Sequence, residues 1–241
     1  MRITLLELPA SWGDPAGVLA HVDAELSRGG EADLVLLPEA SLTGYVSEAG
    51  DFDLSRFAER ADGATARALS DLARRHRVNL VAPLVLAGDG GTIFNAMAAF
   101  DRDGKPIFTY RKRHPWFPET WATPGPEPAP VVEIDDLRVT IATCYDVHFL
   151  EEDAAAALDE ADLLLFPSAW VEHPDSRPAM LRELAQRHRI AVANANWAPG
   201  VVAIAGQGSS SILDASGAVL ARARRSSGAA RVEATVARAK R

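Results

Sequence analysis

The feature that most constrains the fold is the alternation of apolar runs of strand length with segments of helical period. A strand is predicted at residues 3–8 and a helix across 14–29, which begins at Asp14 as N-cap, carries Pro15 in its first turn and ends at Gly29. The same order is repeated by a strand at 33–40 and a helix at 62–77. Alternation of this kind predicts a layered α/β structure.

From residue 78 onward, strands joined by short turns replace this alternation. The strand at 78–86 precedes a hairpin that turns at Asp103-Gly104, so antiparallel pairing is expected there. Prolines crowd residues 114–130, which are expected to form a long ordered loop. Further hairpin turns are predicted at Asp135-Asp136 and Ser216-Gly217, helices at 151–160 and 177–189, and strands at 162–170, 190–197, 202–206, 209–223 and 230–237.

Three polar or reactive side chains lie where apolar runs end: Glu39, Lys112 and Cys144. Ligands of open α/β sheets bind at the carboxyl ends of strands, so these side chains are expected to converge on one crevice. Cys144 is the only cysteine of the chain, and taken alone a free cysteine is most often a small buried hydrophobe. A catalytic role requires a neighbouring base or a positive field, because only the thiolate is a good nucleophile.

The residues alone leave the identity of that base open. His148 lies four residues beyond Cys144, so a Cys/His thiol hydrolase is one alternative. A carboxylate is the other, although Glu39 taken singly could be a helix N-cap and Lys112 a solvated strand end. Solvated or capping roles are expected for the histidines in predicted helices, which are His21, His76 and His188.

Three motifs occur in the order Glu, Lys, Cys: LLPEASLTGY (36–45), TYRKRHPWFPE (109–119) and TCYDVHF (143–149). Together with FPSAW after the cysteine and the late GQGSSSILDASGAVLA, they resemble the nitrilase, or carbon-nitrogen hydrolase, superfamily. The resemblance runs nearly end to end. It implies one carbon-nitrogen hydrolase domain over residues 1–241, built as a four-layer αββα sandwich of two mixed sheets with helices on the outer faces.

The resemblance also implies a role for each motif residue. Cys144 would be the nucleophile, Glu39 the general base and acid, and Lys112 the charge that stabilises the oxyanion, with the Tyr145 backbone N–H as second donor. Glu119 resembles the family's second glutamate, which binds the lysine and positions substrate; its offset from Lys112 is about a residue shorter than usual. The candidate substrate-binding residues are Tyr45, Trp116, Tyr145 and Trp170.

The residues around the cysteine indicate a branch of the superfamily. Cys144-Tyr145-Asp146 and the proline- and tryptophan-rich loop resemble amidases, which predicts hydrolysis of a small linear amide through a thioester, with release of ammonia and a carboxylic acid. The segments 148–150 and 183–190 depart from the family pattern. The alternatives are a nitrilase or an N-carbamoyl amide hydrolase with the same triad, or a family member that keeps the fold without turnover.

Charge and composition limit the partners. A net charge of −8 argues against general binding of nucleic acid, and no apolar run reaches the roughly 18 residues of a membrane span. Neither a metal nor a cofactor is expected, since no Cys/His cluster has zinc-site spacing. The expected partner is a small-molecule amide, the expected compartment the cytoplasm, and the resemblance implies a homodimer or higher homo-oligomer. The basic segment 221–241 is either an anion-binding arm or, the preferred interpretation, a solvated strand pair and tail.

Overall fold

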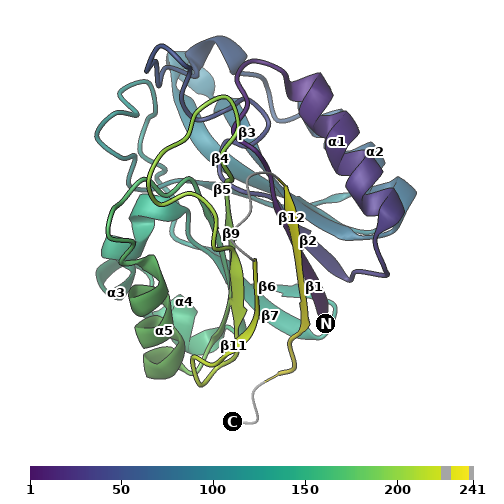
Figure 1. Ribbon diagram of the computed structural model, residues 1–241, viewed down its shortest axis with the longest axis vertical. Helices are drawn as coiled ribbons and strands as arrows, with labels where there is room; N and C mark the ends of the chain where they lie inside the picture. Colours follow the sequence, from purple (N-terminus) through teal and green to yellow (C-terminus); the bar gives the residue numbers. More distant parts are fainter. Residues whose placement is uncertain (224–228, 239–241) are drawn as a thin grey trace.

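The computed structural model describes residues 1–223 and 229–238, and its strands form two six-stranded sheets (Figure 1). The first sheet contains β1 (Arg2–Glu7), β2 (Leu34–Leu36), β3 (Asn79–Ala87), β4 (Ile93–Phe100), β5 (Pro106–Arg111) and β12 (Ala230–Thr235). The second contains β6 (Val132–Ile134), β7 (Leu137–Ile141), β8 (Leu163–Ser168), β9 (Ala191–Asn196), β10 (Ser211–Leu213) and β11 (Val219–Arg222). The helices are α1 (Pro15–Arg28), α2 (Ala64–His76), α3 (Leu150–Asp153), α4 (Ala155–Glu160) and α5 (Arg177–His188).

Both sheets are mixed, as predicted, and they share one pattern of connection. The strand orders are β12-β1-β2-β3-β4-β5 and β11-β10-β9-β8-β7-β6. In the first sheet β1, β2 and β3 are parallel, and in the second β7, β8 and β9 are parallel; antiparallel strands flank each parallel centre. The chain therefore builds the same arrangement twice, a relation that the sequence pattern indicated only loosely.

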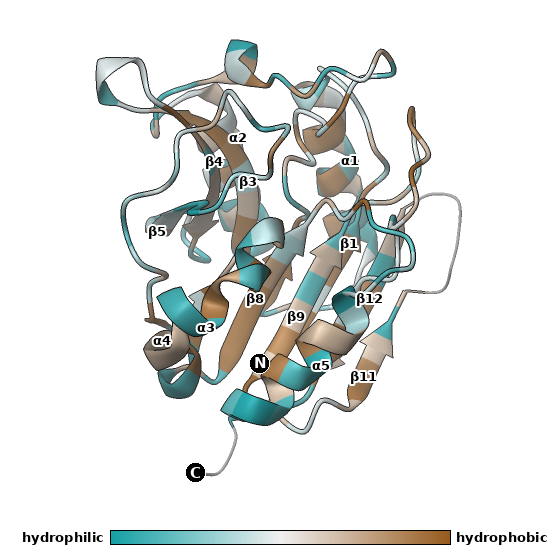
Figure 2. Cartoon of the chain, turned by 90° about the vertical axis from the view of Figure 1, so that its left-hand side faces the viewer, coloured by the Kyte–Doolittle hydropathy of each residue, from teal (hydrophilic) through white to brown (hydrophobic). Residues whose placement is uncertain are grey.

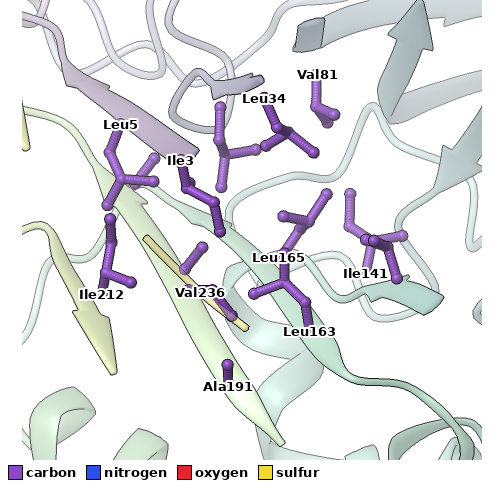
Figure 3. Close-up of a cluster of buried hydrophobic side chains, with 14 of the residues drawn as sticks. Ile3, Leu5, Leu34, Val81, Ile141, Leu163, Leu165, Ala191, Ile212 and Val236 are labelled. Atoms are coloured by element: carbon purple, nitrogen blue, oxygen red, sulfur yellow. The ribbon is translucent and has the colours of Figure 1, made fainter. Parts of the chain in front are cut away.

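Side chains that alternate along each strand create the four layers. On β2, Leu34 and Leu36 face the other sheet while Val35 faces the helices. On β8, Leu163 and Leu165 likewise enter the core between the sheets, which Figure 3 shows in close-up. Because both faces of each central strand are covered, the strands are continuous apolar runs rather than alternating ones.

Helices cover the outer face of each sheet. Figure 1 shows α1 and α2 on one side of the paired sheets and α3, α4 and α5 on the other. Buried residues of α1 and α2 join one hydrophobic cluster with the first sheet, and those of α3, α4 and α5 join another with the second. The helices carry hydrophilic residues in Figure 2, whereas the central strands are mostly hydrophobic. The predicted four-layer αββα sandwich is confirmed.

Local signals placed the first helix correctly. Asp14 is the N-cap of α1, and its Oδ1 accepts a hydrogen bond of 2.9 Å from the Gly17 N–H. Pro15 occupies the first turn, where its missing N–H costs nothing, and the helix ends at Gly29. The predicted hairpins at Asp135-Asp136 and Ser216-Gly217 are present as β6–β7 and β10–β11.

Two predicted elements were wrong. Residues 202–206 form no strand: Val202 and Ile204 pack against the aromatic residues near the site, whereas Ala203 and Ala205 are exposed, and Gly206 (φ 92) crosses too close to Trp170 for a Cβ. The helix expected at 151–160 is divided into α3 and α4 at Ala154, which leaves helical geometry at φ −141. The run of alanines there contains no glycine or proline that would have marked the break.

The C-terminal basic segment lies partly outside the described residues, which exclude 224–228 and 239–241. Its two strands do not pair with each other as preferred above: β11 pairs with β10 of the second sheet, and β12 pairs with β1 of the first. Within 1–223 and 229–238, no helix is both long and apolar enough to cross a membrane.

Candidate active site

The candidate residues come from both sheets. Glu39 follows β2 and Lys112 directly follows β5, both in the first sheet, whereas Cys144 lies just beyond β7 of the second. The Lys112 N–H continues the pairing of β5 with β4 through a 2.8 Å hydrogen bond to the Asn95 carbonyl. The pairing of β5 with β4 thus fixes Lys112 beside Asn95. The packing of the two sheets determines how Cys144 is positioned relative to these two residues.

Lys112 lies between two carboxylates. Its Nζ is 2.7 Å from Glu39 Oε1 and 2.7 Å from Glu119 Oε1, and the three side chains are at most 1% exposed. Burial alone would lower the pKa of Lys112, but the charges of Glu39 and Glu119 outweigh burial and raise it above its ordinary value. Lys112 is therefore a permanent ammonium, and two of its three N–H donors are in use.

Glu119, whose placement was uncertain in the sequence, lies in this cluster. Its Oε1 accepts a 2.5 Å hydrogen bond from the Tyr45 hydroxyl as well as the bond from Lys112. Burial raises the pKa of Glu119, and Lys112 opposes part of that rise. Burial and the charge of Glu119 also raise the pKa of Tyr45, so its hydroxyl keeps the proton that it donates.

Asn95 is a site residue that the sequence did not single out. Its Nδ2 lies 2.8 Å from Glu39 Oε1 and 3.3 Å from Glu119 Oε2, so one amide spans both carboxylates. It is 3% exposed and stands alone among apolar residues in the run IFNAMAAF of β4. A single amide in a buried apolar strand is the signal that could have identified it, because such groups need hydrogen-bond partners.

The second oxygen of Glu39 faces the other sheet. Oε2 accepts a 3.0 Å hydrogen bond from the Ala169 N–H, just beyond β8. A carboxylate oxygen has about two acceptor sites, so Oε2 keeps one for another donor. Glu39 is thus held by both sheets and retains capacity to accept a proton.

Cys144 occupies a strained turn. Its φ of 48 lies in the left-handed region, where a residue with a side chain costs about 1–2 kcal/mol. The chain passes there from β7 into a short 3₁₀ helix, Cys144–His148. Asp146 holds this turn, because its Oδ2 accepts from the Thr143 N–H at 3.0 Å and from the Tyr110 hydroxyl at 2.8 Å. A strained turn that projects a nucleophile after a strand also occurs in other hydrolases.

Electrostatics keep the Cys144 sulfur protonated at rest. Burial raises the pKa of its thiol well above the ordinary value, and the Glu39 carboxylate raises it further. Lys112 and the Ala169 N–H act in the opposite direction without reversing the shift. A buried neutral thiol becomes a nucleophile only if a base removes its proton as it reacts.

A hollow of about 290 Å³ opens onto Cys144. All four predicted substrate-binding residues line it. The lining consists of Tyr45, Trp116, Cys144, Tyr145, His148, Ala169, Trp170, Val171 and Glu172. The Tyr45 hydroxyl is committed to Glu119, so this residue offers the hollow its ring.

The histidines lie apart from the sulfur. His148 is exposed at the hollow and stacks on Trp170 with a centroid distance of 6.2 Å; among the described residues it makes no hydrogen bond to Cys144. His76 and His188 hydrogen-bond Asp23 and Asp159 at 2.6 and 2.7 Å on the helices. Across residues 1–223 and 229–238, no group of three or more His, Cys, Asp or Glu side chains could hold a metal ion.

A second buried cation, Arg177, lies behind the hollow and was not predicted. It is 1% exposed, and its Nη2 donates to Asp175 Oδ2 at 2.9 Å and to the Gly208 carbonyl at 3.0 Å. Asn196 binds the same carbonyl at 2.8 Å and accepts from the Trp170 N–H at 3.0 Å. Arg177 and Asn196 therefore fasten the chain on both sides of Ala169, whose N–H reaches Glu39.

Comparison with known proteins agrees with this geometry. The carbon-nitrogen hydrolase family model matches residues 2–240. A 2-oxoglutaramate amidase from Bacillus subtilis is 28% identical over 239 residues, which cover 96% of this chain and 89% of the relative. An omega-amidase from Danio rerio is 27% identical over 82% of this chain and 74% of its own.

Solved structures give the same result. The amidase from Nesterenkonia sp. AN1 superposes with a TM-score of 0.84 at 27% identity, covering 98% of this chain and 92% of that one. A variant of that amidase carries the acetamide moiety of fluoroacetamide covalently at its active-site cysteine; its TM-score is 0.82 at 26% identity, over 97% of this chain and 89% of that one. A family match along almost the whole chain, over a fold shared with an amidase of the nitrilase superfamily, shows that this protein belongs to the carbon-nitrogen hydrolase family.

Proposed function

We propose that this carbon-nitrogen hydrolase is an amidase that converts a small linear amide into a carboxylic acid and ammonia through a thioester on Cys144. The observation that carries the proposal is the position of Lys112, whose Nζ is 2.7 Å from both Glu39 and Glu119 and whose charge acts on the thiol of Cys144, a residue that lines the hollow. One buried ammonium between two buried carboxylates provides a proton acceptor and a fixed positive charge beside one sulfur.

The first step forms the bond from sulfur to carbon. The Cys144 sulfur attacks the amide carbonyl while Glu39 accepts the thiol proton, so no net charge is created in the buried site. The carbonyl oxygen becomes an oxyanion, which is held by the third N–H of Lys112 and the backbone N–H of Tyr145. A preorganised donor of this kind contributes roughly 10²- to 10³-fold in rate.

The second step breaks the bond from carbon to nitrogen. Glu39 returns its proton to the departing nitrogen, ammonia leaves, and the acyl group stays on sulfur as a thioester. Water then attacks the thioester carbonyl, giving one proton to Glu39, and the carboxylic acid departs as that proton returns to the Cys144 sulfur. Glu119 takes no proton in this scheme; it orients Lys112 and is oriented by Tyr45.

Two further observations support a short amide. The hollow of about 290 Å³ lies at the lower end of the roughly 300–1,000 Å³ of ligand pockets in proteins, which favours a small substrate. Structures of Nesterenkonia amidase variants hold butyramide and, as a covalent adduct at the active-site cysteine, the acetamide moiety of fluoroacetamide. Both are small linear amides, and the adduct supports the same nucleophile here.

The test is ammonia release from short amides by the wild-type protein and by Cys144→Ala. We expect the alanine variant to lose roughly 10⁴-fold or more in kcat/KM, because no other group replaces the attacking sulfur. Intact mass after incubation with fluoroacetamide should show one adduct on the wild-type chain and none on the variant. Wild-type activity in a folded Cys144→Ala protein would overturn the mechanism, whereas products from nitriles or carbamoyl compounds alone would change the substrate class.

The proposal has a cellular part as well. We propose that residues 1–241 act as one domain, in the cytoplasm, as a homodimer or higher homo-oligomer and without a metal or other cofactor. Light scattering of the purified protein would measure the oligomeric state. Activity after dialysis against a chelator would test the independence from metal.

A further inference from the structure

The lining of the hollow combines aromatic walls with a single carboxylate. Tyr45, Trp116, Tyr145 and Trp170 supply four aromatic rings to the lining, and Glu172 supplies its carboxylate. The Tyr45 and Trp116 rings stack with a centroid distance of 6.4 Å, so they form one continuous wall. Aromatic faces around one negative charge bind cations in proteins, because ring faces carry negative potential.

Glu172 is held in a defined position although it is exposed. Its Oε2 accepts a 3.3 Å hydrogen bond from the Trp170 indole N–H and a 3.0 Å bond from the Ser176 N–H; the Ser176 hydroxyl also donates to it. These bonds lower the pKa of Glu172 and keep it ionised. The bond from the Ser176 side chain has the largest effect. The other oxygen, Oε1, accepts no hydrogen bond from any residue in 1–223 or 229–238, so it is free to bind a ligand.

Positive charge around the hollow is already neutralised. Of the described residues, nine line the hollow, and none of these nine is a lysine or an arginine. Lys112 below it faces two carboxylates, which leaves that cluster with a net negative charge. Arg177 lies 5.9 Å from the Trp170 ring centroid but is paired with Asp175 at 2.9 Å. His148 supplies the one imidazole among these nine lining residues.

We propose that the preferred substrates are short amides that carry an ammonium group at the end away from the carboxamide, with Glu172 and the aromatic walls as the cation subsite. This inference rests on the proposed amidase function and adds the chemical class of the substrate. An anionic group at the same end would face Glu172 without a cation to bind it. The class therefore differs from 2-oxoglutarate-derived amides, which carry a carboxylate and are named for one relative.

Three amides with the same spacer of four methylene groups separate charge from length. They are 5-aminopentanamide, hexanamide and 5-carbamoylpentanoate, which end in an ammonium, a methyl and a carboxylate group. We expect kcat/KM for the ammonium compound to exceed that for hexanamide by about tenfold, the sum of a cation–π contact and a partly exposed ion pair. The carboxylate compound should be the poorest of the three.

Glu172→Gln tests the residue itself. Glutamine keeps the size and can accept the bonds from Trp170 and Ser176, but it removes the charge. The ratio of kcat/KM for 5-aminopentanamide over hexanamide should fall about threefold, because glutamine removes the ion pair and leaves the cation–π contact in place. The matched control is Glu183→Gln, an exposed glutamate on α5 outside the hollow, which should leave that ratio unchanged. A wild-type ratio of one or less, or a ratio that Glu172→Gln does not lower, would overturn the inference.

A readout that needs no turnover distinguishes this inference from the proposed function. Pentylammonium ions should slow the alkylation of Cys144 by iodoacetamide in a saturable way, whereas pentanoate ions should not. In Glu172→Gln the pentylammonium concentration required should rise about threefold, because only the ion pair is removed. Protection without hydrolysis of any amide would refute the amidase and keep the cation subsite; hydrolysis of hexanamide without protection or preference would refute the subsite and keep the amidase.

Discussion

Two buried cations lie on either side of one short segment, and they have different environments. Lys112 contacts Glu39 and Glu119, keeps one N–H donor unused, and its charge acts on the Cys144 thiol. Arg177 directs its donors at Asp175 and at the Gly208 carbonyl, inside the protein. The first environment provides spare donor capacity for a reacting group, and the second provides rigidity.

Neighbouring residues connect the two environments. Ser168 is 3.5 Å from Arg177 Nη1, and the next residue, Ala169, donates to Glu39 at 3.0 Å. The comparison shows that the type of cation at each position fits its role. A lysine ammonium presents a compact charge with rotatable donors, whereas the planar guanidinium holds several fixed acceptors at once. Variants at the two cations should therefore separate chemistry from stability.

The largest effect is expected for Lys112→Met. Loss of the oxyanion charge and of the group that aligns both carboxylates should lower kcat/KM for a short amide roughly a thousandfold. The variant should also lose stability as pH rises. Without Lys112, the pKa of the buried Glu119 is raised further, and a folded state that holds a proton more tightly than the unfolded state is destabilised when that proton is lost.

Arg111→Met is the matched control, one residue earlier on β5. Arg111 forms an ion pair with the exposed Glu127, so its replacement should leave kcat/KM within about twofold and change stability by under about 0.5 kcal/mol. Ammonia release and urea denaturation at two pH values measure both quantities. Equal losses of activity in the two variants would show that Lys112 has no special role.

A smaller effect, on stability, is expected for Arg177→Met. The change removes the guanidinium bonds to Asp175 and to the Gly208 carbonyl, which keeps its bond from Asn196, and this should cost about 2 kcal/mol in the free energy of unfolding. The control is Arg182→Met, on the exposed face of α5, with an expected change under about 0.5 kcal/mol. The midpoint of urea unfolding at unchanged slope is the measurement. If the Arg177→Met protein were as stable as the wild type, Arg177 would not have the structural role that distinguishes it from Lys112.

The smallest effect is expected for Tyr45→Phe, which removes one hydrogen bond to Glu119. That bond is among the contacts that lower the pKa of Glu119 against the larger effect of burial, so the pKa should rise further in the variant. Since ionised Glu119 orients Lys112, the acid limb of the kcat/KM profile should move to higher pH. A loss of roughly tenfold corresponds to one hydrogen bond to a charged group. If kcat/KM fell at every pH and the acid limb stayed at the same pH, the proposed effect of Tyr45 on the ionisation of Glu119 would be contradicted.

Part of the site could be predicted from the sequence because its residues lie at the ends of strands. The runs before Glu39, Lys112 and Cys144 are apolar and of strand length, and the order of their motifs resembled one superfamily. Asn95, Arg177 and the Ala169 N–H were not found. Asn95 sits in the middle of a strand, Arg177 belongs to a predicted helix, and a backbone N–H leaves no mark in the sequence.

Errors in the fold arose where apolar residues pack without a sheet. Residues 202–206 have strand composition, yet only Val202 and Ile204 pack beside the aromatic cluster, partly buried, and the segment pairs with neither sheet. The break between α3 and α4 at Ala154 falls in a run of alanines, where helix propensity is high throughout. Local preference did not decide the structure in either place.

The sequence by itself determined the layered α/β class and the strand-end positions of the motifs, because alternation and turn signals act over a few residues. The resemblance of those motifs to one superfamily added the four-layer sandwich and the amidase-like branch. Only the tertiary structure decided that Lys112 stands 2.7 Å from both carboxylates and that the Cys144 turn is held by Asp146. It also placed Glu172 against Trp170 at the hollow. These contacts join positions on different strands and loops, and their distances follow from how two sheets pack, which no local pattern encodes.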